Sequence, residues 1–113
     1  VAGGTGEGVI AAADETGHFA IGVDSDQDYL APGHVLTSML KRADVAVFQL
    51  IQRTVNGEPA GGILRLGLAN GGIDLSPMIY TRHLIPRDVS EQLAQIRQMI
   101  LDGAITVTDI TMF

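Results

Sequence analysis

The stretch IGVDSDQD, residues 21–28, is a short apolar strand that runs directly into an acidic loop. Asp24 stands where the apolar residues stop. In an open α/β sheet, ligands are held just beyond the carboxyl ends of the strands. A carboxylate at that place can accept hydrogen bonds from two hydroxyl groups, so it suits a sugar or ribose diol. The alternative is a polar loop that does no more than end a strand.

A glycine-rich turn, GGTGEG at residues 3–8, precedes this strand and lies between an apparent strand end and a helix. Backbone N–H groups at such a junction favour anions or hydroxyl groups. The turn is not a dinucleotide fingerprint, because position 9 is valine, and no Gly-Lys-Ser/Thr follows it as in a phosphate-binding loop. Glu7 would also repel a phosphate. The turn therefore suits a neutral, hydroxyl-bearing ligand, or it is simply a tight turn.

Lys41 follows a second apolar stretch, residues 35–40, so it also stands at the end of an expected strand. Beside Asp24 it could form an ion pair across a cleft, or donate a hydrogen bond to a ring nitrogen or hydroxyl of a ligand. Taken alone, Lys41 would be interpreted as a surface lysine ahead of a helix.

The sequence gives little support for a metal site or a catalytic nucleophile. Aspartates at positions 24, 26 and 28 have the spacing that opens a calcium loop, but the glycine and glutamate that this motif needs are replaced by Tyr29 and Val35. We therefore expect Asp26 and Asp28 to be solvated. The histidines lack metal-ligand spacing, there is no cysteine, and no serine lies in a nucleophile elbow. We expect no catalytic residue, no metal and no cofactor.

Length and charge limit the classes of partner. The chain has 113 residues and begins with Val1 rather than methionine, so we expect a piece of a longer protein. A formal net charge of −6 opposes a nucleic-acid partner and an anionic membrane surface. No apolar run approaches the roughly 20 residues of a membrane span.

Helical and strand patterns alternate along the chain, which predicts an α/β fold: half of a doubly wound, mainly parallel sheet. The first strand is expected to be buried on both faces. Asn70-Gly71 predicts a hairpin, Asp44 a helix cap, and Asp88 with Glu91 a capping box on a helix that Gly103 ends. The expected helices are 7–15, 44–54 and 88–102, and the expected strands are 18–24, 34–40, 63–68, 73–75 and 105–110.

Three ordered segments, AGGTGEGVIAAA (2–13), FAIGVDSDQDYLAPG (19–33) and HVLTSMLKRADVAVF (34–48), resemble the basic membrane protein family of solute-binding lipoproteins. Members of that family bind purine nucleosides for ABC importers. The resemblance implies a type I periplasmic-binding-protein fold, in which two α/β lobes close on a ligand. This chain would be roughly its last third. Residues 1–42 would be part of the second ligand-binding lobe, and residues 43–113 a helix, crossover strands and a C-terminal helix that returns between the lobes.

The resemblance also implies roles for individual residues. The backbone of Gly3 or Gly4 would approach the ligand, Asp24 would accept the ribose hydroxyls, and Lys41 would contact the base or an adjacent carboxylate. The partners would be a nucleoside, an ABC permease, and either the missing N-terminal segment or a second copy of the chain. The location would be periplasmic or cell-surface, with a lipid anchor on a segment outside this chain.

Three alternatives remain open at this point. The same fold carries ligand-sensing regulatory lobes and sugar-binding proteins, and fold alone does not settle function. An enzyme acting on a nucleoside or sugar is the third, although no catalytic group stands out in the sequence.

Overall fold

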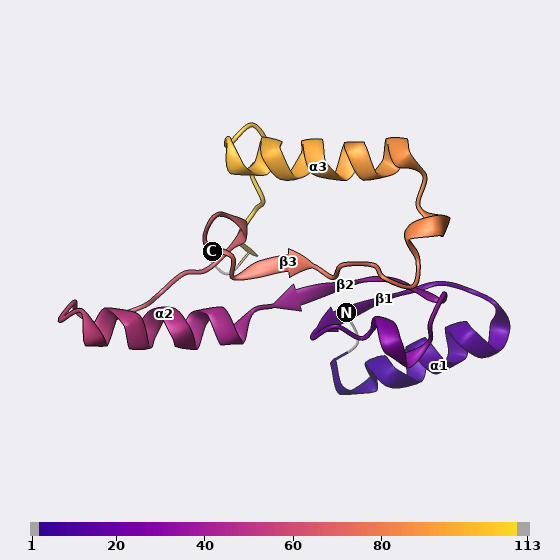
Figure 1. Ribbon diagram of the computed structural model, residues 1–113, viewed down its shortest axis with the longest axis horizontal. Helices are drawn as coiled ribbons and strands as arrows, with labels where there is room; N and C mark the ends of the chain where they lie inside the picture. The colour runs from indigo at the N-terminus through magenta and orange to yellow at the C-terminus, as the bar shows by residue number, and fades with distance from the viewer. Residues whose placement is uncertain (1–2, 111–113) are drawn as a thin grey trace. The chain divides into compact units, whose positions relative to one another are not determined.

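The computed structural model describes residues 3–110 and contains three α-helices and three strands (Figure 1). The described chain forms two compact units that divide between His83 and Leu84. Among residues 3–110, no helix combines the length and apolar character that a membrane span requires. The elements are η1 (Gly3–Thr5), α1 (Gly6–Thr16), β1 (Ala20–Asp24), η2 (Asp28–Leu30), β2 (Val35–Lys41), α2 (Ala43–Val55), η3 (Leu68–Asn70), β3 (Ile73–Leu75), η4 (Arg82–Leu84) and α3 (Arg87–Leu101), where η marks a single 3₁₀ turn.

The first unit is built on a sheet with the strand order β1-β2-β3. β1 and β2 are parallel, with Gly22 opposite Ser38 and Asp24 opposite Leu40. β3 adds to the other side of β2 in the antiparallel direction, with Met39 opposite Leu75. The predicted α/β class is confirmed, with one antiparallel strand beside a parallel pair.

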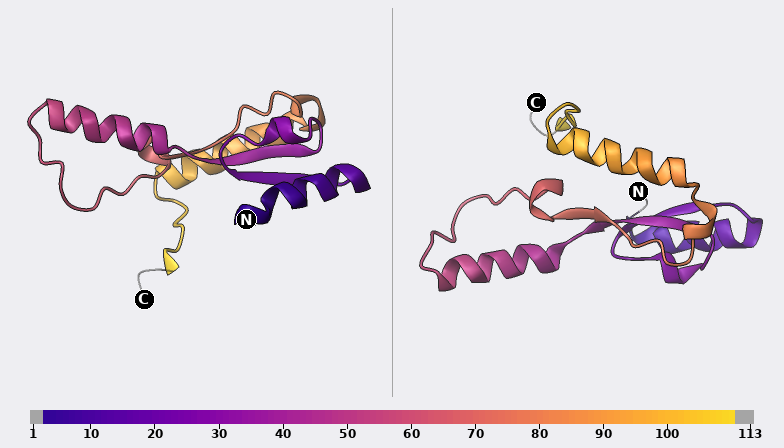
Figure 2. Two further views of the ribbon diagram at one scale, coloured as in Figure 1. Left: turned by 90° about the horizontal axis from the view of Figure 1, so that it is seen from below. Right: turned by 45° about the horizontal axis from the view of Figure 1, so that its top comes forward.

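The core lies between α1 and the parallel strands β1 and β2, and Figures 1 and 2 show α1 running along one side of these strands. Its buried apolar side chains are small: Ile10, Ala13, Ala20, Ala31 and Val35. α1 ends at Thr16, and the next residue, Gly17, has a left-handed φ of 69° and donates its N–H to the last turn of the helix.

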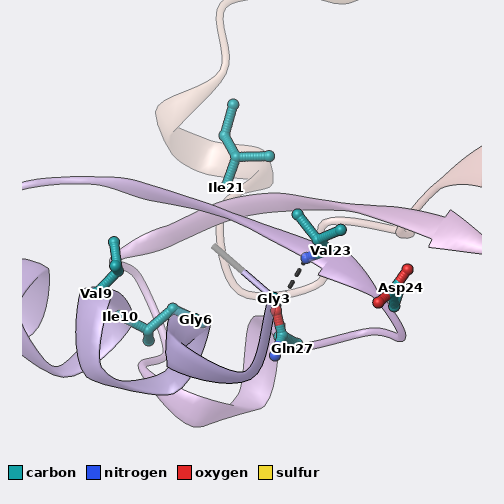
Figure 3. A pocket seen from close by; sticks show the side chains of 8 residues that line it. All are labelled: Gly3, Gly6, Val9, Ile10, Ile21, Val23, Asp24 and Gln27. Atoms are coloured by element: carbon teal, nitrogen blue, oxygen red, sulfur yellow. Dashed lines mark hydrogen bonds between the residues drawn. The ribbon is translucent and has the colours of Figure 1, made fainter. Parts of the chain in front are cut away.

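The prediction that β1 is buried on both faces is wrong. Ala20 and Gly22 are buried, whereas Ile21 is 64% exposed and points away from α1 (Figure 3). Successive side chains in a strand point to opposite faces, and α1 covers only one of them. The expectation assumed a second covering layer, which the described residues do not supply.

The predicted strand at 63–68 and the Asn70-Gly71 hairpin are wrong. Residues 63–67 have no regular structure, and β3 pairs with β2 instead. The Asn70 side chain explains the turn: its Oδ1 accepts a hydrogen bond from the Gly67 N–H and its Nδ2 donates to the Arg65 carbonyl. These bonds fold residues 65–71 back on themselves, and residues 63–68 do not pair with β3.

The predicted helix caps are also wrong. Asp44 is the second residue of α2, where it pairs with Arg42, and no side chain caps the helix. α3 begins at Arg87 after Pro86, so Asp88 lies inside its first turn, and Glu91 accepts a hydrogen bond from Arg87. Gly103, with a φ of 76°, follows the end of α3 as expected.

The second unit contains α3 and the residues that follow it. Residues 105–110 alternate apolar and polar side chains, but they form no strand. A strand needs a neighbouring strand to satisfy its backbone groups, and the described part of this unit offers none.

Candidate functional site

Asp24, the last residue of β1, has a left-handed backbone with a φ of 74°. The Ser25 N–H donates to the Val23 carbonyl across it at 3.0 Å. An i to i+2 hydrogen bond around a positive φ defines the rarer and more strained form of γ-turn. Aspartate tolerates this region better than most residues, but a non-glycine residue held there is uncommon. Such strained positions concentrate at functional sites.

Lys41 forms an ion pair with the Asp24 carboxylate. Its Nζ lies 3.1 Å from Asp24 Oδ1. The parallel register places Asp24 opposite Leu40, so both side chains emerge at the same edge of the sheet. The two side chains are 68% and 57% exposed, and an exposed pair of this kind contributes at most about 1 kcal/mol to stability. Both charges therefore stay accessible to a ligand.

A small cavity of about 70 Å³ opens beside Asp24, between the start of α1 and β1 (Figure 3). Sites for a whole small-molecule ligand usually measure about 300–1,000 Å³, so this cavity fits only part of one. It is lined by Gly3, Gly6, Val9, Ile10, Ile21, Val23, Asp24 and Gln27.

The glycine turn reaches the cavity through one of its two candidate residues. Gly3 lines it and has a left-handed φ of 54°, which a residue with a Cβ rarely adopts. Gly4 is exposed and does not line the cavity. The structure therefore brings together Gly3, Asp24 and Lys41, and leaves Gly4 outside this group.

Gln27 was not singled out by the sequence analysis, although it lines the cavity. Its Oε1 accepts a hydrogen bond from the Val23 N–H at 2.9 Å, as Figure 3 shows, so its Nε2 remains as a donor. The Gln27 N–H in turn donates to Ser38 Oγ at 3.0 Å. The only sequence signal was its place three residues beyond the strand end.

The expectation that Asp28 is solvated is wrong. Asp28 is 2% exposed rather than solvated, and its carboxylate accepts hydrogen bonds from Ser38 Oγ at 2.7 Å and Ser76 Oγ at 2.6 Å. Asp26 is exposed, as expected, and its Oδ1 accepts the Asp28 N–H. The acidic loop thus carries three aspartates in three environments: one paired with lysine, one exposed and one buried.

Arg42 and Asp44 form an ion pair next to Lys41. Arg42 Nε lies 2.9 Å from Asp44 Oδ1, and Arg42 Nη2 lies 2.8 Å from Asp44 Oδ2. These hydrogen bonds from Arg42 lower the pKa of Asp44 to about 2. Arg42 is engaged with Asp44, whereas the cation that pairs with Asp24 at this strand end is Lys41.

The histidines show no metal site. His34 Nδ1 bonds to the His18 carbonyl at 2.9 Å, and its Nε2 lies 3.6 Å from Asp14. Within residues 3–110, no group of three or more metal-ligating side chains comes together.

Comparison with known proteins identifies relatives of the whole chain. Residues 1–111 match the Bmp family, described as ABC transporter substrate-binding protein PnrA-like. Basic membrane protein D of Borreliella burgdorferi is 37% identical over 112 residues, which cover 94% of this chain and 32% of that protein. The ABC transporter nucleoside-binding protein BmpA of Lactococcus lactis is 32% identical, over 94% of this chain and 34% of that protein.

The fold has a match among solved structures. An ABC transporter solute-binding protein from Aeropyrum pernix superposes with a TM-score of 0.65 at 26% identity, over 92% of this chain and 38% of that chain. The chain spans about a third of the length of the curated relatives that it matches. It belongs to the PnrA-like family of ABC transporter substrate-binding proteins, the family of the basic membrane proteins.

Proposed function

We propose that the protein containing this chain is the solute-binding component of an ABC importer and that it binds a nucleoside, with a purine base favoured. The observation that carries the proposal is the Asp24–Lys41 pair beside a cavity at the carboxyl ends of β1 and β2. The name of the Lactococcus lactis relative, a nucleoside-binding protein, supports the ligand class.

Each site residue has a distinct task in this proposal. The Asp24 carboxylate has two oxygens and accepts hydrogen bonds from the 2′- and 3′-hydroxyls of ribose. The turn at Gly3 and Gly4 lets the backbone approach the ligand closely, and Gly3 is the one that lines the cavity. Lys41 orients the Asp24 carboxylate and donates to the base. Binding by these groups breaks no bond, so we assign no catalytic residue and no cofactor.

Binding is coupled to closure of two lobes. Residues 1–42 supply one wall of the cleft, and residues 43–113 supply the helix and crossover segments that lead to the other lobe. A ligand that touches both lobes stabilises the closed state, and the membrane permease reads that state. A ligand without the ribose hydroxyls would leave Asp24 poorly paired in the closed cleft, and the site would therefore reject it.

The remainder of the protein carries the lipid anchor and covers apolar side chains that are exposed in this chain. Relatives from Pyrococcus are named lipoproteins, which supports a periplasmic or cell-surface location with a lipid anchor elsewhere in the protein. The exposed apolar side chains of β1 and α2 are covered by the rest of the protein, or by a second copy when this chain is alone.

Titration calorimetry of the full-length protein tests the proposal. Inosine, guanosine and adenosine are compared with 2′,3′-dideoxyinosine and with free ribose. We expect micromolar or tighter binding of at least one purine nucleoside and at least a tenfold loss without the two hydroxyls. Binding of free sugars alone, or chromatographic detection of nucleoside turnover, would overturn it in favour of a sugar-binding protein or an enzyme.

A further inference from the structure

The buried carboxylate of Asp28 has an unusual set of partners. It is 2% exposed, and its side-chain partners in residues 3–110 are two serine hydroxyls rather than a cation. Ser38 and Ser76 are themselves 0% and 4% exposed. Burying a carboxylate without a cation is costly, and the cost is offset only by good hydrogen bonds. Stability alone therefore does not explain why a carboxylate is buried at this position.

The direction of each hydrogen bond in this cluster follows from the backbone. Ser38 Oγ accepts the Gln27 N–H, and Ser76 Oγ accepts the Ser38 N–H at 2.9 Å. Each hydroxyl has one hydrogen, and both hydrogens point to Asp28. Thr37 Oγ1, 3.0 Å from Ser76 Oγ, must then be the donor of that contact. The cluster therefore requires two acceptors at position 28, which a carboxylate provides and an amide does not.

This cluster ties the acidic loop to two distant parts of the first unit. Ser38 lies in the middle of β2, and Ser76 follows β3. On the loop side, the Gln27 N–H bonds to Ser38, and the Gln27 side chain holds the Val23 N–H. The residues on both sides of Asp24 are thus anchored to the sheet, while Asp24 itself occupies the strained γ-turn.

We propose that Asp28, held by Ser38 and Ser76, is a positioning residue that keeps Asp24 in its left-handed conformation, with the carboxylate aimed at the ligand diol. A strained backbone persists only where its surroundings enforce it. Without the Asp28 anchor the loop relaxes, and the Asp24 carboxylate leaves the place beside Lys41. This inference rests on the proposed function of Asp24 as the acceptor of the ribose hydroxyls.

Asp28→Asn in the full-length protein tests the inference, because it keeps the shape of the side chain and removes one acceptor. Asp26→Asn is the matched control: it makes the same charge change two residues away, on an exposed side chain whose Oδ1 acceptor is retained. Inosine affinity is measured by calorimetry, and 2′,3′-dideoxyinosine affinity by displacement at millimolar concentration. Melting temperatures are recorded for every variant.

We expect Asp28→Asn to weaken inosine binding at least fivefold and to change dideoxyinosine binding by less than twofold. The double variant that combines Asp28→Asn with Asp24→Ala should bind inosine no more weakly than Asp24→Ala alone. Asp26→Asn should stay within twofold of wild type. An equal loss for both ligands, or an additive loss in the double variant, would assign Asp28 a purely structural role and overturn the inference.

Three further outcomes are separated by the same design. If Asp28→Asn does not fold, Ser76→Ala, which keeps the carboxylate and removes one donor, must show the same selectivity for the diol, and its absence overturns the inference. If Asp24→Ala itself binds inosine like wild type, the proposed function of Asp24 fails and this inference fails with it. If Asp24→Ala weakens binding while Asp28→Asn does not, only the inference fails.

Discussion

Gly22 and Ser38 face each other across β1 and β2, and there is no room for a side chain on the glycine. A Cβ at position 22 would collide with Ser38 Oγ and would stand 2.9 Å from Gln27 Cβ. The first prediction is that Gly22→Ala destabilises the full-length protein by roughly 1–3 kcal/mol, as overpacking of a buried site does. Thermal unfolding followed by circular dichroism measures the change.

Gly8→Ala is the control for this substitution. Gly8 lies within α1, where a Cβ would meet no atom within 4 Å. Alanine favours a helix over glycine by roughly 0.5–1 kcal/mol, so this variant should melt at a higher temperature than wild type. Equal melting temperatures for Gly22→Ala and wild type would show that the contact between β1 and the loop is looser than described.

The second prediction separates binding from strain at Asp24. Asp24→Ala and Asp24→Gly both remove the carboxylate, so both should weaken nucleoside binding at least tenfold in calorimetry. Only glycine relieves the left-handed backbone, so Asp24→Gly should be more stable than Asp24→Ala by about 1 kcal/mol. If the two variants unfold at the same temperature, the φ of 74° costs nothing in the intact protein.

The third prediction concerns Lys41. Lys41→Met should weaken nucleoside binding several-fold, because the Asp24 carboxylate loses the cation 3.1 Å away and the ligand loses a donor. The free energy of unfolding should change by no more than about 1 kcal/mol, since both side chains are exposed. Arg53→Ala, which removes a cation from α2, is the control and should leave affinity unchanged. A loss of affinity as large in the control would indicate a general effect of charge.

The place of Asp24 could be predicted because the signal is local. An apolar run that ends in a charged residue predicts a strand end, and parallel strands bring their carboxyl ends to the same edge. Lys41 follows from the same rule applied to the next strand. Both residues are found where this reasoning puts them, and their role in binding stays a prediction.

The burial of Asp28 could not be predicted, because its partners come from elsewhere in the chain. Ser38 is 10 residues away and Ser76 is 48 residues away, and they meet Asp28 only in the tertiary fold. The failed strand at 63–68 has a related cause. Alternation of apolar residues describes one strand, whereas pairing depends on which neighbour is available, and here β2 takes β3.

The fourth prediction is a pH dependence that arises from Asp44. Hydrogen bonds from Arg42 lower the pKa of Asp44 from 3.8 to about 2 in the folded protein. A carboxylate with a lowered pKa stabilises the fold fully above its unfolded pKa, and this contribution is lost as the pH falls through the folded pKa. The loss should therefore occur between about pH 4 and pH 2, with no effect near pH 7.

Carboxyl chemical shifts in an NMR titration measure this pKa directly. Arg42→Gln should return the pKa of Asp44 toward 3.8, and with it the acid-induced loss of stability should diminish. An Asp44 pKa that does not respond to Arg42→Gln would mean that the ion pair is not formed in solution.

The fifth prediction concerns the apolar side chains of α2. Val47, Phe48 and Ile51 are between 57% and 66% exposed in this chain, and such a surface drives association unless something covers it. Analytical ultracentrifugation of the isolated 113-residue chain should therefore detect species larger than one chain. Phe48→Glu should shift the distribution toward the monomer, whereas Gln52→Glu, with the same charge change on the same helix, should not. A monomer at all concentrations would indicate that α2 needs no cover, and the rest of the protein would then have no required contact with this helix.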